Sequence, residues 1–409
     1  MGSKRSSQSS YILLTFAISF FFRGLLENLL PYLMCLLCGC RLNGALSNGD
    51  ALMRMNAERC FEEHNQLERE GRRYKHTLVL ILKSSMDIGI IKRVIDLSVD
   101  PTFLIYWGKK MIKRWGTVFS TMYNRALPGL FPLTCFDLRS GLFLWMDDFI
   151  GKARRDRRGR IKNIGKVVAT KVLKCVDFLQ QSDLGIKIMS LTGDEGMTSK
   201  YLLNELKKRK IKHLFALKSS SKLREHIPSI KNWSKLKDGR RIGIKRNLTY
   251  YGVKTNLIVV KDEDRTYLYI TSYRKSAKYA WRKFSRRGNH ENGIGDAKSI
   301  GLEDGRPSTN IFQIKGHALA CTYLLILLKA LCERLNLSQN NFEPQTVKNL
   351  FTRECYVRWE AGRMIALVIV SRTLLAKIGT SSIAWEGGTI EFLWHQDRKA
   401  SPSKILSKG

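Results

Sequence analysis

Acidic residues are scarce in this chain of 409 residues, in which 35 Asp and Glu stand against 71 Lys and Arg. The formal net charge is therefore +36, and the basic residues are spread along the chain rather than confined to a tail. A protein with this excess needs a polyanionic partner, and nucleic acid is the commonest one. An anionic membrane surface is the alternative. A hydrophobic content of 44% excludes general disorder, and the length allows two or three domains.

Long apolar runs are missing from the N-terminal region, where a span of about 20 residues would be needed to cross a bilayer. The two candidates, Tyr11–Phe22 and Leu29–Cys40, are both shorter, and Pro31 interrupts the second. Charged residues follow the first run where a signal peptide would carry a cleavage site of small residues. We interpret the runs as two buried helices, with a membrane hairpin as the alternative, so a membrane partner is not expected.

A complete zinc site is also missing. Cys35, Cys38 and Cys40 resemble half of one, but no second Cys/His pair with ligand spacing follows them. The nine cysteines are odd in number and lie mostly inside apolar segments, which is typical of buried thiols in a reducing compartment. We therefore expect a cytoplasmic protein, associated with the nucleoid if its partner is DNA.

The hydrophobic pattern predicts an α/β protein built from several regions. Residues 47–75 have helical spacing, and we assign residues 1–85 to a helical N-terminal domain that binds DNA ends, although no helix-turn-helix signature is visible. Buried strands then alternate with amphipathic helices. Strand Lys187–Leu191, helix Thr198–Lys210 with Thr198 as N-cap, and strand Lys212–Leu217 predict a parallel pairing with a crossover.

The second half of the chain changes character twice. Short antiparallel strands are expected at Arg241–Arg246, Leu248–Val253, Leu257–Val260 and Tyr267–Tyr273. Helical signal resumes at Ser276, and Phe312–Leu335 and Met364–Ile378 are predicted as apolar helices. The resulting regions are a core over residues 86–219, a β-rich insertion over 220–275, a second part of the core over 276–340, and a C-terminal helical region with a basic tail over 341–409.

Three acids from distant segments suggest chemistry on a nucleic-acid backbone. Asp100 and Asp194 each stand where a hydrophobic strand is expected to end, and Glu291 lies between the cations Arg287 and Lys298. Phosphodiester chemistry needs a nucleophile and compensation of phosphate charge, and two Mg²⁺ ions about 4 Å apart supply both. Hard cations of this kind take carboxylate oxygens as ligands. Asp96 competes with Asp100 for the first position, although the residues after Asp100 favour it.

The spacing of these residues resembles the DDE transposases of bacterial and archaeal insertion sequences. The similar members form the cut-and-paste group, whose signature is Tyr, two residues, Arg, three residues, Glu, six residues and Lys. Phe284, Arg287, Glu291 and Lys298 reproduce that spacing with Phe in place of Tyr.

Two further motifs carry the resemblance, which covers about residues 90–335. Asp100-Pro101-Thr102, followed by Tyr106-Trp107-Gly108, resembles the strand of the first aspartate. Gly193-Asp194-Glu195-Gly196-Met197 resembles the turn of the second.

The resemblance implies a ribonuclease H-like catalytic core, a mixed sheet flanked by helices, in a transposase that acts on double-stranded DNA. Asp100, Asp194 and Glu291 would bind two Mg²⁺ or Mn²⁺ ions, with no small-molecule cofactor. Water activated at the metals would cut the element end, and the freed 3′-hydroxyl would attack target DNA. Arg287 and Lys298 would hold phosphates near the cut, whereas Phe284 lacks the phenolic hydroxyl of the signature Tyr. A homodimer in the DNA complex is expected.

Several residues also fit a reading without catalysis. Gly288, Gly293 and Gly295 surround Glu291, and each costs a helix about 1 kcal/mol relative to Ala. His290 stands where the resemblance calls for an apolar residue, so either the helix is irregular or the chain is a decayed, inactive DNA-binding relative. A basic membrane-associated protein is the third reading. Asp137, Asp147 and Asp148 are interpreted as solvated turn residues, and Glu195 and His290 as bystanders to the chemistry.

Overall fold

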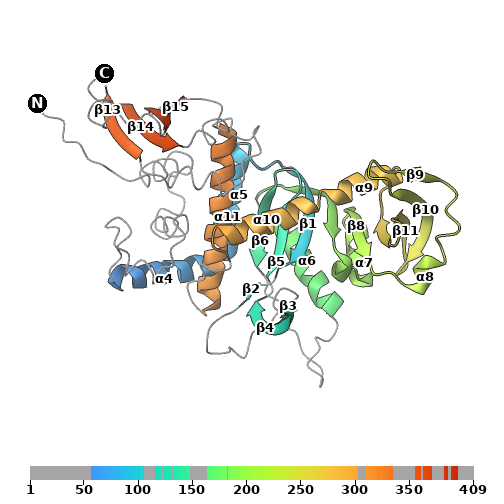
Figure 1. Cartoon of the computed structure of the whole chain (residues 1–409). Helices are drawn as coiled ribbons and strands as arrows, with labels where there is room; N and C mark the ends of the chain where they lie inside the picture. The colour runs from blue at the N-terminus through green and yellow to red at the C-terminus, as the bar shows by residue number, and fades with distance from the viewer. Residues whose placement is uncertain are drawn as a thin grey trace, which may run out of the picture. The chain divides into compact units, whose positions relative to one another are not determined.

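The computed structural model describes residues 57–102, 104–105, 116–120, 124–130, 132–147, 164–181, 183–302, 310–334, 355–360, 363–370, 382–385 and 388–394 (Figure 1). Two compact units are distinguished: residues 70–295 with 309–322, and residues 1–69, 296–308 and 323–409. The runs 11–22 and 29–40, with their three cysteines, lie outside the described residues. Tyr106, Trp107 and Gly108 also lie outside them, as does Asp148.

The first unit is a mixed α/β structure built on a nine-stranded sheet in the order β6-β5-β1-β7-β8-β12-β11-β10-β9. Strands β1, β7 and β8 are mutually parallel, and all the other pairings in this sheet are antiparallel. The strands are β1 (Val94–Pro101), β5 (Leu133–Asp137), β6 (Leu142–Asp147), β7 (Lys187–Gly193), β8 (Lys212–Leu217), β9 (Trp233–Lys235), β10 (Arg241–Tyr250), β11 (Val253–Lys261) and β12 (Thr266–Thr271).

The β-rich stretch 220–275 continues this sheet rather than forming a sheet of its own. Residues 268–271 of β12 pair with β8 in antiparallel register, and β11, β10 and β9 follow outward. Strand β10 runs through the predicted strand Arg241–Arg246 and on to Tyr250. The predicted strand Leu248–Val253 is wrong at its end, because Tyr251 and Gly252 form the turn between β10 and β11. Both turn residues have positive φ angles, 51° and 77°, which a regular strand does not allow.

Helices flank the sheet. They include α5 (Tyr74–Asp87), α6 (Ile164–Gln181), α7 (Lys200–Lys208), α9 (Ala277–Ser285), α10 (Gly288–Ser299) and α11 (Ile311–Arg334). The predicted unit of β7, α7 and β8 is confirmed, except that Ser199 rather than Thr198 caps α7, since its side chain accepts a hydrogen bond from the Leu202 amide. Within the described residues, α11 is the one helix long and apolar enough to cross a membrane, and 78% of its apolar window is buried, as in the core helix of a globular protein.

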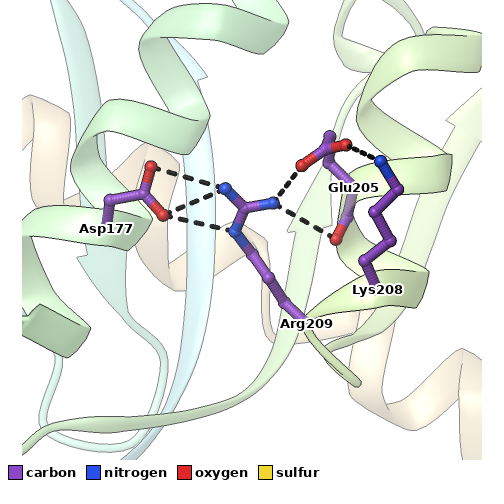
Figure 2. A network of polar contacts seen from close by, with 4 residues as sticks. All are labelled: Asp177, Glu205, Lys208 and Arg209. Atoms are coloured by element: carbon purple, nitrogen blue, oxygen red, sulfur yellow. Dashed lines mark hydrogen bonds and ion pairs between the residues drawn. The ribbon is translucent and has the colours of Figure 1, made fainter.

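An ion-pair network fastens the end of α7 to α6 (Figure 2). Arg209, which follows α7, donates to Asp177 of α6 through Nε at 3.2 Å and Nη2 at 3.1 Å. The same guanidinium pairs with Glu205, which also accepts from Lys208 at 2.8 Å. Helix α7 starts directly after the turn that carries Asp194, so the network fixes the helix on which that turn is mounted.

The prediction of a helical region over residues 341–409 is wrong for the described part. Instead, β13 (Cys355–Glu360), β14 (Arg363–Val370), β15 (Ser382–Trp385) and β16 (Gly388–Trp394) form a sheet in the order β13-β14-β16-β15. Helix Met364–Ile378 was inferred from apolar content, but β14 begins at Arg363 and is paired on both sides. A short apolar run fits a buried strand as well as a helix. Helix α4 (Ala57–Arg72) confirms the described part of the segment 47–75.

Candidate active site

Three carboxylates from distant segments converge on one guanidinium group, that of Arg287. Its Nη2 lies 2.7 Å from Asp100 Oδ2 and 3.5 Å from Asp194 Oδ2, and its Nη1 lies 2.6 Å from Glu291 Oε1. The Arg287 side chain is only 12% exposed, whereas those of Asp194 and Glu291 are about half exposed. The structure therefore brings together all three acids that the sequence singled out, with one of the predicted phosphate-binding cations between them.

The sheet places two of these acids side by side. Asp100 lies near the end of β1, and Asp194 directly follows the neighbouring parallel strand β7. Val99 pairs with Gly193, so Asp100 and Asp194 occupy the next level at the carboxyl edge of both strands. Asp194 Oδ1 accepts from the amide of Glu195 at 2.9 Å, which leaves Oδ2 to face Arg287. Glu195 is exposed in the short helix η3 (Glu195–Met197).

One face of β1 holds the segment that supplies Glu291. Asp96, Ser98 and Asp100 alternate along the strand and therefore point to the same face of the sheet. Asp96 binds Lys283, Ser98 binds His290 and Asp100 binds Arg287. Each partner comes from α9, α10 or the junction between them (Figure 1 shows α10 in front of β1, β5 and β6). These three side-chain contacts hold α9 and α10 against β1 and thereby fix the position of Glu291.

Asp96 is a structural anchor rather than an open acid. Its side chain is 3% exposed and accepts from Lys283 Nζ at 2.7 Å, Ser190 Oγ at 2.7 Å and Arg139 Nε at 2.9 Å. Burial alone would raise its pKa, but these donors hold the pKa below its usual value. Of Asp96 and Asp100, it is Asp100 that shares a guanidinium partner with the other two acids.

Asp137 is not the solvated turn residue that we inferred from the sequence. It is fully buried at the end of β5, where its carboxylate accepts from the backbone amides of Asp96, Arg139 and Ser140. These bonds hold the chain reversal after β5 against β1. Asp147, the last residue of β6, is paired in the ladder opposite Leu133.

His290 is buried completely and links α10 to two strands. Thr134 Oγ donates to the carbonyl of Asp100 at 2.6 Å, so it accepts from His290 Nε2 at 2.9 Å. The other ring nitrogen, Nδ1, then accepts from Ser98 Oγ at 2.9 Å. Burial, reinforced by the charge of Arg287, lowers the pKa of His290 to about 3, so the ring is neutral at pH 7. His290 orients the helix that carries Glu291.

The glycine-rich stretch forms a helix, and its irregularity lies before Glu291. Helix α9 ends at Ser285 and α10 begins at Gly288, so Arg287 stands at a break between two helices. Gly293 permits close packing, because a Cβ there would lie 2.5 Å from Cε2 of the Phe136 ring. That ring also stacks on His290 at a centroid distance of 5.1 Å. A helix with a larger residue at position 293 could not approach the sheet as closely.

Asp100 has an unusual protonation equilibrium. Burial, together with the charges of Asp194 and Glu291, raises its pKa to about 6 against the lowering effect of Arg287. Crowded carboxylates of this kind favour a site that accepts additional positive charge, because each added cation relieves their mutual repulsion.

The three carboxylates fit the chemistry of a magnesium site, which takes a few carboxylate oxygens and retains water. In the arrangement described, however, Arg287 lies where a cation would bind. Among the described residues, no group of three or more His, Cys, Asp or Glu side chains could hold a metal ion as it stands. Nε of Arg287 is buried without a hydrogen-bond partner in this part of the chain. The donor set is suitable for a divalent metal once the guanidinium leaves.

The remaining predicted residues lie on the same two helices. Phe284 packs with its ring 4.5 Å from that of Tyr269 in β12, so it contributes to an aromatic cluster at the side of the site. Lys298 lies two turns beyond Glu291 on α10, on the same side of the helix. Sequence reasoning missed Lys283, Thr134 and Tyr269. The alternation of Asp96, Ser98 and Asp100 along the expected strand was the sequence signal that could have indicated Lys283 as a partner of Asp96.

Comparisons with known proteins leave the family open. No protein-family model matches the chain. A search of curated proteins gives no significant match.

Proposed function

We propose that this chain is a nucleic-acid phosphodiesterase of the recombinase type, a DNA transposase that cuts and rejoins double-stranded DNA with two divalent metal ions. The convergence of Asp100, Asp194 and Glu291 on one guanidinium carries the proposal. These acids were chosen from the sequence alone, by expected strand ends and by motif spacing, and successive acids are about a hundred residues apart along the chain. Three acids so far apart in the sequence are not expected to lie together by chance in a chain with a net charge of +36.

The architecture supports the ribonuclease H-like part of the proposal. The resemblance implies a mixed sheet flanked by helices, with two aspartates at strand ends and a glutamate on a helix over the same face. The mixed sheet, the neighbouring parallel ends of β1 and β7, and helix α10 have these positions. The β-rich stretch 220–275 joins the same sheet next to β8.

The roles of the residues follow from their chemistry. Asp100, Asp194 and Glu291 would hold Mg²⁺ or Mn²⁺, which supplies an activated water and compensates the charge on the reacting phosphate. Arg287 screens the three acids in the free protein and turns to a backbone phosphate when DNA arrives, as a guanidinium suits such oxygens. Lys298 adds a second phosphate contact further along α10. His290 and Lys283 keep the two helices in register with β1.

The partner, the oligomeric state and the compartment are part of the same proposal. The partner is double-stranded DNA, bound by a homodimer in a reducing cytoplasm. The rival reading is a DNA-binding relative without catalysis, and the central position of Arg287 is the observation that favours it. If the guanidinium never leaves, the carboxylates cannot take up metal.

The cleavage test uses purified full-length protein, a labelled linear duplex and Mg²⁺ or Mn²⁺. Asp194→Asn should abolish metal-dependent cleavage while leaving binding of the duplex intact, because the Asp194 side chain is half exposed, its contact with Arg287 is long at 3.5 Å, and an amide oxygen can still accept from Glu195. Asp183→Asn is the matched control, since that carboxylate is 86% exposed and pairs with Lys83 at the surface. Binding without cleavage in the unmodified protein would favour the rival reading, and absence of binding would refute both.

A metal-binding test addresses Arg287 without relying on activity. Arg287→Gln removes the positive charge from the cluster and should bind Mn²⁺ at least about tenfold more tightly than the unmodified protein at pH 7.5, without DNA, measured by calorimetry. Asp194→Asn in the same background should reverse the gain. Equal affinities with and without Arg287 would show that the guanidinium does not compete with metal.

A further inference from the structure

One row of residues crosses four strands at the level of the carboxylates. Val99 pairs with Gly193, Gly193 pairs with Phe215, and Ala216 pairs with Tyr269. The next level along the sheet therefore contains Asp100, Asp194, Ala216 and Tyr269 in that order. Directly opposed residues point to the same face of a sheet, so the Tyr269 side chain lies on the face that carries the acids.

The space between Asp194 and Tyr269 is occupied by a small residue. Ala216 is the one partly exposed position among residues 213–217 of β8, whose other side chains are buried. No large side chain from β8 therefore separates the acid from the phenol in this row. Tyr269 lies within electrostatic range of both Asp194 and Arg287, as the influence of these two charges on its pKa indicates.

The ring of Tyr269 is held firmly, whereas its hydroxyl has no hydrogen-bond partner in the part of the chain that the structure describes. Phe284 and Trp281 of α9 pack against the ring at centroid distances of 4.5 Å and 5.5 Å. The residue is 7% exposed, yet its hydroxyl has no hydrogen-bond partner among the described residues and is not one of their fully buried polar atoms. A largely buried phenol normally finds a partner for its O–H. This one is left to a ligand or to water.

The surroundings favour an anionic ligand for this hydroxyl. Arg240, which also pairs with Asp238, lies over the Trp281 ring at 5.1 Å from its centroid, and Arg287 lies 3.5 Å from Asp194 in the same row. Burial raises the pKa of Tyr269 to about 12, so at pH 7 the phenol is neutral and can donate its proton in a hydrogen bond without repelling a phosphate.

We propose that Tyr269 is a substrate-contacting residue of this site, whose phenol donates a hydrogen bond to a nonbridging phosphate oxygen of the nucleic acid that lies over Asp100 and Asp194. The assignment rests on the proposed function. It also supplies, from β12, a hydroxyl donor next to the ring of Phe284, which has none of its own. Sequence spacing could not reveal it, because Tyr269 is 15 positions before Phe284 and reaches the site through strand pairing.

The test removes the oxygen alone. Tyr269→Phe keeps the ring packing and should weaken binding of a short duplex roughly ten- to a hundredfold, the effect of one hydrogen bond to a charged acceptor. The salt dependence of binding should stay the same, since a neutral phenol releases no counterions. Tyr201→Phe is the control, because that phenol lies on α7, is 42% exposed and lines a separate cavity with Arg209.

A second measurement identifies the atom contacted. Duplexes that carry a single methylphosphonate at successive positions should include one for which Tyr269→Phe no longer changes the affinity. Equal binding by the unmodified protein and Tyr269→Phe would overturn the assignment and leave the proposed function standing. A uniform loss at every methylphosphonate position would also overturn it. If the unmodified protein binds no nucleic acid, the proposed function itself fails.

Discussion

Gly293 offers a sharp test of how α10 is packed on the sheet. Replacing it by alanine adds a methyl group 2.5 Å from Cε2 and 3.1 Å from Cζ of Phe136. That ring is 2% exposed, and the rings of Phe143 and His290 lie 5.1 Å from it on other sides, so it has little room to move. Overpacking of this kind costs about 1–3 kcal/mol. It outweighs the gain of about 1 kcal/mol that Ala brings to a helix over Gly.

Gly295 in the same helix provides the matched control. A Cβ at Gly295 would have no neighbour within 4 Å, so Gly295→Ala gains the helical preference without the clash. Gly295→Ala should therefore raise the free energy of unfolding by about 1 kcal/mol. Gly293→Ala should lower it by about 1 kcal/mol, the midpoint of the overpacking cost less the helical gain. The difference of about 2 kcal/mol corresponds to roughly 4–8 °C in Tm for a unit of this size.

Thermal unfolding of both variants measures this difference, and a double variant locates its cause. Phe136→Leu withdraws the ring atoms that the new methyl group would meet. Gly293→Ala should then be less destabilising in the Phe136→Leu background than in the unmodified protein, which is a coupling between contacting residues. Shifts of the same sign and size for Gly293→Ala and Gly295→Ala would refute the packing described for α10.

Three further predictions concern stability. Gly71→Ala should lower the free energy of unfolding by about 3 kcal/mol, or prevent soluble expression, because its Cβ would lie 1.7 Å from the carbonyl oxygen of Phe312. The backbone there cannot move aside as a side chain can, and an unchanged urea unfolding curve would contradict this contact. Asp96→Asn should cost about 3 kcal/mol by leaving the partly buried Lys283 without its counter-charge, and Lys283→Met combined with it should recover part of that loss. His213 is buried with a pKa lowered to about 4, whereas the unfolded chain takes up this proton near pH 6.5. His213 should therefore contribute a fall of about 3 kcal/mol in the free energy of unfolding as the pH decreases from 6.5 to 4, and the curve of His213→Gln, measured in parallel, should differ from that of the unmodified protein by this amount.

Much of the central unit could be predicted from its sequence because its elements carry strong local signals. The strand at 187–193, the helix at 164–181 and the strand at 212–217 follow periodicity and appear as expected. Asp100 and Asp194 were found because strand ends are visible in the sequence. Glu291 was found because its neighbours fall at a recognisable spacing.

The rest depends on contacts that no local pattern contains. Asp137 was expected to be solvated, yet it is buried, and its carboxylate accepts from two amides of its own turn and from the amide of Asp96 in β1. Arg287 lies among the acids because the chain breaks between α9 and α10. The glycines of this stretch give no sequence signal for the place of that break. The strand β14 was mistaken for a helix because apolar content alone does not distinguish the two in a short run.

The pairing of β12 with β8 has a practical consequence for anyone who wants a smaller version of this protein. Deleting residues 220–275 would strip the hydrogen-bonding partner from one side of β8 and leave a bare strand edge, which invites association with other chains. A trimmed protein must therefore retain β12 or cover that edge by other means. Shortening at the turn between β10 and β11 is the safer starting point, because it leaves the pairing of β8 with β12 intact.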